Sequence, residues 1–313
     1  MTTIKPPRLR KGDLIGLIAP ASTPSNEEKI VKGVEYLERL GYQVKLGKYI
    51  RNVHGFLAGT DEDRASDINE MVRDKNVKAI FSIRGGYGTP RLLQLINYHA
   101  LKQNPKIIVG YSDLTALQLA IFRKVGLVTF SGPMTGVDLW KVIDPYTEEQ
   151  FWRLLTSNKK VGSLENPLEE PVIILRQGKA RGRLLGGNLS LLVSLLGTPF
   201  QPALRGSILV LEDVDEAPHR VDRMLAHLLN AGVLRGLAAL VFGKFSDCKP
   251  RDPEEPYLKI DEIQEEYTAK IKCPVITNLQ YGHIPKKLTL PLGLQTTLDT
   301  KHKRIEVLES CVS

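Results

Sequence analysis

The first half of the sequence alternates between short apolar runs and longer amphipathic stretches, and this alternation limits the folds open to the chain. Strands that alternate with helices form a parallel sheet covered on both faces, and ligands bind at the carboxyl ends of its strands. The apolar runs predict strands at residues 14–19, 42–46, 79–83, 107–110 and 128–130. Helical spacing of apolar residues predicts helices at 26–40, 61–73, 90–96 and 114–124.

The second half departs from this regular pattern. A segment rich in Asn, Lys, Glu and Pro suits a linker at residues 156–172. At 313 residues the chain is long enough for two domains, which we expect at 1–155 and 173–313. Strands are predicted at 179–184, 207–211, 237–242, 275–277, 288–290, 295–298 and 304–308, with helices at 188–196 and 217–231.

Composition argues against nucleic acids and membranes as partners. The net charge is +8, but the basic residues are scattered and aromatic residues make up only 6%, which favours a solvated basic surface. No stretch approaches the roughly 20 apolar residues of a membrane span. Residues 14–21 loosely mimic a signal peptide, but the run is short and follows Gly12-Asp13. A first parallel strand is therefore the favoured interpretation.

Cysteine usage favours a reduced protein. Cys248, Cys273 and Cys311 are far apart and lack the paired spacing of metal ligands. We therefore expect neither a disulfide framework nor a zinc site. A cytoplasmic protein without metal or cofactor is the simplest interpretation.

Ser112 lies in a tight turn between the predicted strand 107–110 and the predicted helix 114–124. A serine in such a turn projects from the strand end, and the helix that follows aims N–H groups and its positive dipole at the surroundings. Nucleophilic hydrolases need that environment because the attacked carbonyl develops negative charge. The usual elbow has glycine two residues to either side, and here Leu114 replaces the second glycine. By itself the turn favours a structural strand-to-helix corner.

A glycine-rich loop, Arg84-Gly85-Gly86-Tyr87-Gly88, follows the predicted strand 79–83 at the same sheet edge. Glycines let a backbone bend sharply and present N–H donors to a ligand. The loop is not a G-x-G-x-x-G motif and does not follow the first strand, so nucleotide binding is the less favoured interpretation. The N–H of Asp113 is a second candidate donor, because the residue after the nucleophile usually supplies half of an oxyanion hole.

His283 is the best-placed candidate for a general base. It lies in a loop bracketed by Gly282 and Pro285, whereas the other five histidines suit surface or packing roles. The predicted strand 207–211 ends in Glu212-Asp213, and a carboxylate there can orient an imidazole. Only one of the two acids should face the site, because successive side chains of a strand alternate. Serine hydrolases do use the resulting chain order of serine, acid and histidine.

Seven short motifs occur in order over residues 13–293. They are Arg84-Gly85-Gly86-Tyr87-Gly88, Gly110-Tyr111-Ser112-Asp113, Ser131-Gly132-Pro133-Met134, Gly186-Gly187-Asn188-Leu189, Leu211-Glu212-Asp213, Asp222-Arg223-Met224-Leu225 and Gly282-His283. Together they resemble the LD-carboxypeptidase (muramoyltetrapeptide carboxypeptidase) family of serine peptidases, which also contains the microcin C immunity protein. The resemblance implies Ser112 as nucleophile, His283 as general base and acid, and Glu212 as its orienting acid. It implies the N–H groups of Gly86 and Asp113 as the oxyanion hole.

The resemblance also implies an architecture. The fold class would be α/β, with a flavodoxin-like N-terminal domain that carries the serine. A C-terminal mixed α/β domain with a partly barrel-like sheet would carry the acid and the base. Members of the family are commonly cytoplasmic homodimers without metals.

The implied activity is cleavage of the L-centre/D-Ala bond of cytoplasmic murein tetrapeptides in peptidoglycan recycling, through an acyl-enzyme. Arg84 is a candidate for binding the free carboxylate of the substrate, and a structural salt bridge is the alternative role. A microcin-C-like immunity peptidase that acts on an aminoacyl-nucleotide analogue is the second hypothesis, and a non-catalytic protein that binds small anions is the third. The sequence leaves open whether the third residue of the peptide is diaminopimelate or lysine.

Overall fold

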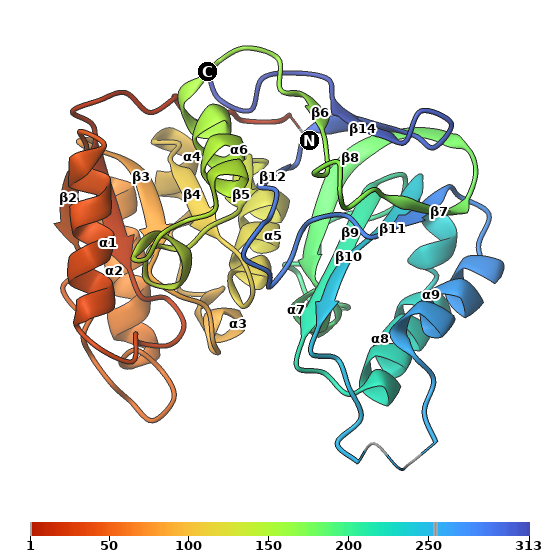
Figure 1. Cartoon of the computed structure of the whole chain (residues 1–313). Coiled ribbons are helices and arrows are strands. Elements are labelled where there is room, and N and C mark those ends of the chain that lie inside the picture. Colours follow the sequence, from red (N-terminus) through yellow and green to blue (C-terminus); the bar gives the residue numbers. More distant parts are fainter. Residues whose placement is uncertain (1, 253, 255) are drawn as a thin grey trace.

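The computed structural model describes residues 2–252, 254 and 256–313, and it contains two β-sheets, each packed with helices (Figure 1). The first sheet has the order β12-β5-β4-β3-β1-β2. Five of its strands are parallel: β1 (Leu14–Ile18), β2 (Gln43–Leu46), β3 (Val77–Ser82), β4 (Ile107–Gly110) and β5 (Thr129–Ser131). β4 is buried at every position, as expected of a parallel strand covered on both faces.

Helices connect and cover these parallel strands, as predicted for a flavodoxin-like half (Figure 1). They are α1 (Glu28–Arg39), α2 (Asp61–Arg73), α3 (Thr89–Leu92), α4 (Tyr98–Gln103), α5 (Leu114–Val125), the π-helix η1 (Thr135–Leu139) and α6 (Pro145–Thr156). α3 is shorter than predicted, and α4 was not predicted. Among the described residues, every helix of the chain is too short or too polar to cross a membrane.

The second sheet is mixed and has the order β6-β14-β13-β8-β9-β10-β11-β7. The four adjacent strands β8 to β11 are parallel, and the others pair antiparallel. The order ends on two different strands, so the sheet stays open rather than closing into a barrel. The elements are β6 (Gly162–Leu164), β7 (Ile173–Arg176), β8 (Lys179–Asn188), α7 (Leu189–Ser194), β9 (Ile208–Val214), α8 (Pro218–Asn230), η2 (Leu234–Gly236), β10 (Ala239–Ser246), α9 (Ile260–Ala269), β11 (Val275–Thr277), β13 (Gln295–Asp299) and β14 (Arg304–Val307).

The last strand of the first sheet comes from the far end of the chain. β12 (Leu290–Leu292) pairs antiparallel with β5, two residues later than the predicted strand 288–290. The segment 278–289 therefore crosses from β11 in the second sheet to the first. In addition, β6 lies inside the predicted linker 156–172 and pairs with β14. The domain boundaries themselves stay a prediction.

Both halves contribute to shared apolar clusters. Leu117 and Ile121 of α5 belong to the same buried cluster as Leu185 of β8 and Leu209 of β9. α5 also packs against α7 (Figure 1). Because α5 begins directly after Ser112, this contact fixes the serine turn relative to the second sheet.

Candidate active site

The turn at Ser112 has the backbone geometry of a nucleophile elbow. β4 ends at Gly110, α5 begins at Leu114, and Ser112 between them has a φ of 65°. A positive φ is unusual for a non-glycine residue and is kept only where the surroundings enforce it. Such a turn presents the serine hydroxyl above the sheet, at the N-terminus of the helix. Leu114 in place of the second glycine does not prevent this conformation.

The glycine-rich loop packs directly against Ser112. A Cβ added to Gly85 would lie 2.9 Å from Ser112 Oγ, so only glycine fits at this position. Ser22 holds the loop, because its N–H donates to the Gly85 carbonyl (3.2 Å) and its Oγ accepts from the Tyr87 N–H (3.3 Å). The loop thus forms one wall of the space in front of the serine.

Two backbone donors near Ser112 remain available. Across the described residues, neither the Gly86 N–H nor the Asp113 N–H donates to a protein acceptor. The Asp113 side chain does not cap α5 and instead accepts from the Thr89 N–H at 2.8 Å. Burial raises the pKa of this carboxyl group. Unpaired N–H groups beside a nucleophile are what an oxyanion hole requires.

His283 and Glu212 form a close pair. His283 Nδ1 lies 2.7 Å from Glu212 Oε2, and the Glu212 side chain is fully buried while 18% of His283 is exposed. Glu212 Oε1 has no protein hydrogen-bond partner within the described part of the chain. The tight approach depends on Gly282, where an added Cβ would lie 2.9 Å from Glu212 Oε2.

Asp213 points to the other side of β9, as strand alternation predicts. Its Oδ1 accepts from Asn188 Nδ2 (2.8 Å) and its Oδ2 from the Ser190 N–H (3.0 Å). Burial raises its pKa to about 6. Of the two acids, Glu212 is the one that contacts His283. β9 continues to Val214, so both acids lie within the strand, as their predicted alternation requires.

The histidine loop reaches the serine turn across the two halves. The ring of Tyr111, the residue before Ser112, lies 5.0 Å from the His283 ring at an interplanar angle of 64°. Tyr281, two residues before His283, shares a 2.7 Å hydrogen bond with Ser131 Oγ at the end of β5. The serine turn and the His283–Glu212 pair thus meet through the Tyr111 ring, and groups of these kinds can support acyl transfer by a serine nucleophile.

Comparison with known proteins identifies the family. A model described as the LD-carboxypeptidase N-terminal domain matches residues 15–132, and one described as the LD-carboxypeptidase C-terminal domain matches residues 181–298. The chain belongs to the LD-carboxypeptidase family. It is therefore a peptidase of the carboxypeptidase type, as the resemblance in the sequence implied.

The chain matches its relatives over nearly its whole length. It is 40% identical to the probable murein peptide carboxypeptidase of Bacillus subtilis strain 168, over 99% of this chain and 95% of the relative. It is 31% identical to the microcin C7 self-immunity protein MccF of Escherichia coli, over 97% of this chain and 96% of the relative. A crystal structure of muramoyltetrapeptide carboxypeptidase from Oxalobacter formigenes superposes with a TM-score of 0.83 at 32% identity, covering 96% of this chain and all of the other.

Arg84 lies at the edge of the same site. Its Nη1 donates to the Thr23 carbonyl at 3.2 Å, and the side chain is partly buried. The residues that the structure describes include no carboxylate paired with it, which argues against the salt-bridge role. No group of three or more potential metal ligands occurs among the described residues, and Cys248, Cys273 and Cys311 are free thiols.

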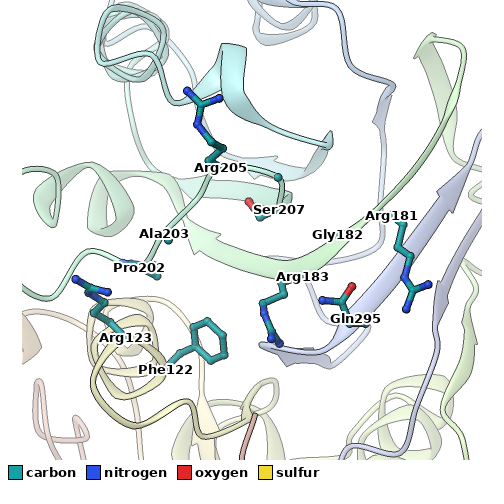
Figure 2. A pocket seen from close by; sticks show the side chains of 11 residues that line it. Phe122, Arg123, Arg181, Gly182, Arg183, Pro202, Ala203, Arg205, Ser207 and Gln295 are labelled. Carbon is teal, nitrogen blue, oxygen red and sulfur yellow. The ribbon is translucent and has the colours of Figure 1, made fainter. Parts of the chain in front are cut away.

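A cavity lies away from Ser112, where α5 ends. It measures about 500 Å³ and is lined by Phe122 of α5 and by four arginines (Figure 2). Figure 2 shows the guanidinium groups spread around the cavity rather than gathered at one point. Arg183 is already engaged with the Thr3 hydroxyl and the Gly293 carbonyl. The cavity therefore presents no convergent anion site. The four arginines are Arg123, Arg181, Arg183 and Arg205.

Two residues beside the site were missed by the sequence analysis. Lys287 and Asp138 form a buried ion pair whose ammonium group lies over the Tyr111 ring. In the sequence Lys287 cannot be distinguished from its neighbour Lys286, which is partly exposed and pairs with Glu169. Asp138 lies on a π-helix, a form that often marks functional sites, but its irregular hydrogen bonding has no sequence signature.

Proposed function

We propose that this chain is a serine-type LD-carboxypeptidase that releases the C-terminal D-alanine from murein tetrapeptides. The observation that carries the proposal is the His283–Glu212 pair, whose imidazole contacts the ring of Tyr111, the residue directly before a serine held at positive φ. A structural role for that serine would not require an oriented histidine beside it. The relatives named as murein peptide carboxypeptidase and muramoyltetrapeptide carboxypeptidase support the substrate class.

The proposed reaction begins with attack by Ser112 Oγ on the carbonyl carbon of the L-centre/D-Ala bond. His283 Nε2 takes the hydroxyl proton, because Glu212 engages Nδ1 and so favours the tautomer with Nε2 unprotonated. The buried carboxylate then stabilises the imidazolium ion. The N–H groups of Gly86 and Asp113 stabilise the oxyanion, helped by the N-terminal dipole of α5.

Collapse of the tetrahedral intermediate breaks the C–N bond. The amine of D-alanine leaves with the proton from His283, and the acyl group stays on Ser112 as an ester. Water then attacks the ester while His283 takes its proton, and a second collapse returns that proton to Ser112. The tripeptide leaves with a free carboxylate, and the enzyme is restored.

An exopeptidase must also recognise a free terminal carboxylate. Arg84 has one hydrogen bond to a backbone carbonyl and directly precedes the glycine loop, so we propose it as the carboxylate partner. We further propose that the enzyme acts as a homodimer in the cytoplasm, where peptidoglycan recycling would supply murein tetrapeptides.

A second candidate function is hydrolysis of an aminoacyl-nucleotide analogue. The likeness to MccF supports it, since a solved structure of MccF in complex with aspartyl sulfamoyl adenosine superposes with a TM-score of 0.90 at 28% identity. A non-catalytic anion-binding role is the third. These candidates predict different products, or none, from the same protein preparation.

The deciding experiment is mass spectrometry of the purified protein incubated separately with murein tetrapeptide and with aspartyl sulfamoyl adenosine. Release of D-alanine and tripeptide supports the first function, and release of aspartate supports the second. Ser112→Ala should abolish either reaction, and a fluorophosphonate probe should label only the protein that retains Ser112. Absence of both turnover and labelling would leave the binding role.

A further inference from the structure

A buried ion pair lies next to the site and has no part in the proposed reaction. Lys287 is 2% exposed, and its Nζ lies 2.8 Å from Asp138 Oδ1. Asp138 Oδ2 accepts from the Met134 N–H at 2.9 Å, which fixes the carboxylate within η1. Two charges buried together usually stabilise a fold no better than apolar side chains of the same volume. The pair therefore calls for a role other than stability.

The Tyr111 ring links the ion pair to His283. Lys287 Nζ lies 4.0 Å from the centroid of the Tyr111 ring, and the same ring lies 5.0 Å from the His283 ring. Tyr111 is itself buried and directly precedes Ser112. Burial, and then the charge of Asp138, raises the pKa of the Tyr111 hydroxyl, so that ring stays neutral and its face attracts the ammonium ion.

The same stretch of chain is anchored on both sides of His283. Before it, Tyr281 bonds to Ser131 of the first sheet. After it, the Lys287 N–H donates to Thr147 Oγ1 (2.8 Å), and that hydroxyl donates to the Pro285 carbonyl (3.0 Å). His283 is thus the middle of a short bridge between sheets, and the Lys287–Asp138 pair is the charged contact at its far end.

We propose that the Lys287–Asp138 pair is a positioning device that holds the histidine loop and the Tyr111 ring so that His283 Nε2 faces Ser112 Oγ. This inference rests on the proposed function for its kinetic consequence. An ion pair suits the task because hydrogen-bonded charges fix both distance and direction, whereas an apolar contact fixes neither. The two residues are 149 positions apart in the chain, so their contact ties the base to the nucleophile's half.

The test is a charge-free double variant, Asp138→Asn with Lys287→Met. Asn keeps an oxygen for the Met134 N–H, and Met fills the volume of the lysine stem. The matched control removes a pair of similar length on the surface, Lys160 and Glu306 (2.7 Å), as Lys160→Met with Glu306→Gln. Both variants are compared with the wild type for melting temperature, for kcat and KM on murein tetrapeptide, and for the rate of labelling by a fluorophosphonate probe.

We expect the double variant to melt near the wild type while kcat and the labelling rate both fall by about tenfold or more, with KM nearly unchanged. The control should lose neither. A purely structural role predicts the reverse, in which melting temperature falls and the folded fraction reacts normally. A folded double variant with wild-type kcat and labelling would overturn the proposal.

A spectroscopic measurement separates this inference from the proposed function. The Nδ1 proton shared by His283 and Glu212 should give a downfield NMR resonance, identified by its loss in Glu212→Gln. In the double variant that resonance should broaden or disappear even if the wild type cleaves no murein peptide. Should the double variant fail to fold, Asp138→Asn alone, which breaks the ion pair and leaves the Lys287 side chain in place, is measured in the same way. An unchanged resonance there would refute the positioning role.

Discussion

Replacing Glu212 by glutamine tests the catalytic reasoning most directly. The side chain is fully buried, and its Oε2 is 2.7 Å from His283 Nδ1, so an amide of the same shape has no other position to take. In one orientation the amide oxygen accepts from the His283 Nδ1–H, but it carries no charge to stabilise the imidazolium ion. In the other orientation the amide NH₂ donates to Nδ1, and the histidine then carries its proton on Nε2, where it cannot act as a base. In a comparable triad the amide lowers kcat by about 10⁴. We expect about 10³ to 10⁴ here, or roughly 4 to 5.5 kcal/mol of transition-state stabilisation.

The assay is release of D-alanine from murein tetrapeptide, with KM measured at the same time. KM should change little, because Glu212 is behind His283 and touches no substrate in the proposed reaction. Melting should be unchanged or improved, since a buried carboxylate with one unpaired oxygen becomes neutral. Asp213→Asn, on the opposite face of β9, is the matched control. Wild-type kcat in Glu212→Gln, or an equal loss in both variants, would refute the assigned geometry.

Three further predictions follow from distances and pKa shifts. Gly282→Ala places a Cβ 2.9 Å from Glu212 Oε2 at a φ of 130°, so we expect a loss of about 1–3 kcal/mol in urea unfolding together with lower kcat. Gly85→Ala places a Cβ 2.8 Å from Ser112 Cβ, and fluorophosphonate labelling should fall sharply while the fold is kept. Burial raises the pKa of Asp213 from 3.8 to about 6, so the folded state holds this proton more tightly than the unfolded chain. Its contribution to stability is therefore greatest at low pH and declines as pH rises from about 4 to 6, by about 3 kcal/mol. The free energy of urea unfolding, measured across this pH range, should depend less steeply on pH in Asp213→Asn than in the wild type. An equal pH dependence in the two proteins would contradict the raised pKa of Asp213.

The first sheet could be predicted because its signals are local. The residues of β4 are apolar at every position, and α5 ends at Val125, directly before Gly126, whose φ of 76° favours glycine. The second half gave less reliable boundaries. α9 was missed because its apolar residues are few.

In the candidate site, too, the local features could be predicted from the sequence and the long-range contacts could not. Strand alternation in β9 was enough to predict that only one acid faces the histidine, because a period of two is a local property. The burial of Lys287 is not local. It depends on the contact between η1 and the segment 278–289, and no local pattern in the sequence around Lys287 or Asp138 predicts that contact.

The pairing of β12 is what brings the distant half of the site to Ser112. Gly110 of β4 is in register with Ser131 of β5, and Ser131 is in register with Leu290 of β12. Ser131 therefore lies between Gly110, where β4 ends before the serine turn, and Leu290, where β12 begins after the histidine loop. The Ser131 hydroxyl also shares a hydrogen bond with Tyr281. Ser131→Ala should therefore loosen the loop on the side opposite to Lys287 and lower kcat without changing KM. Combined with the charge-free pair it should lower kcat by less than the product of the two separate effects, because both contacts restrain one segment. Independent, multiplicative losses would mean that the two anchors act on different parts of the site.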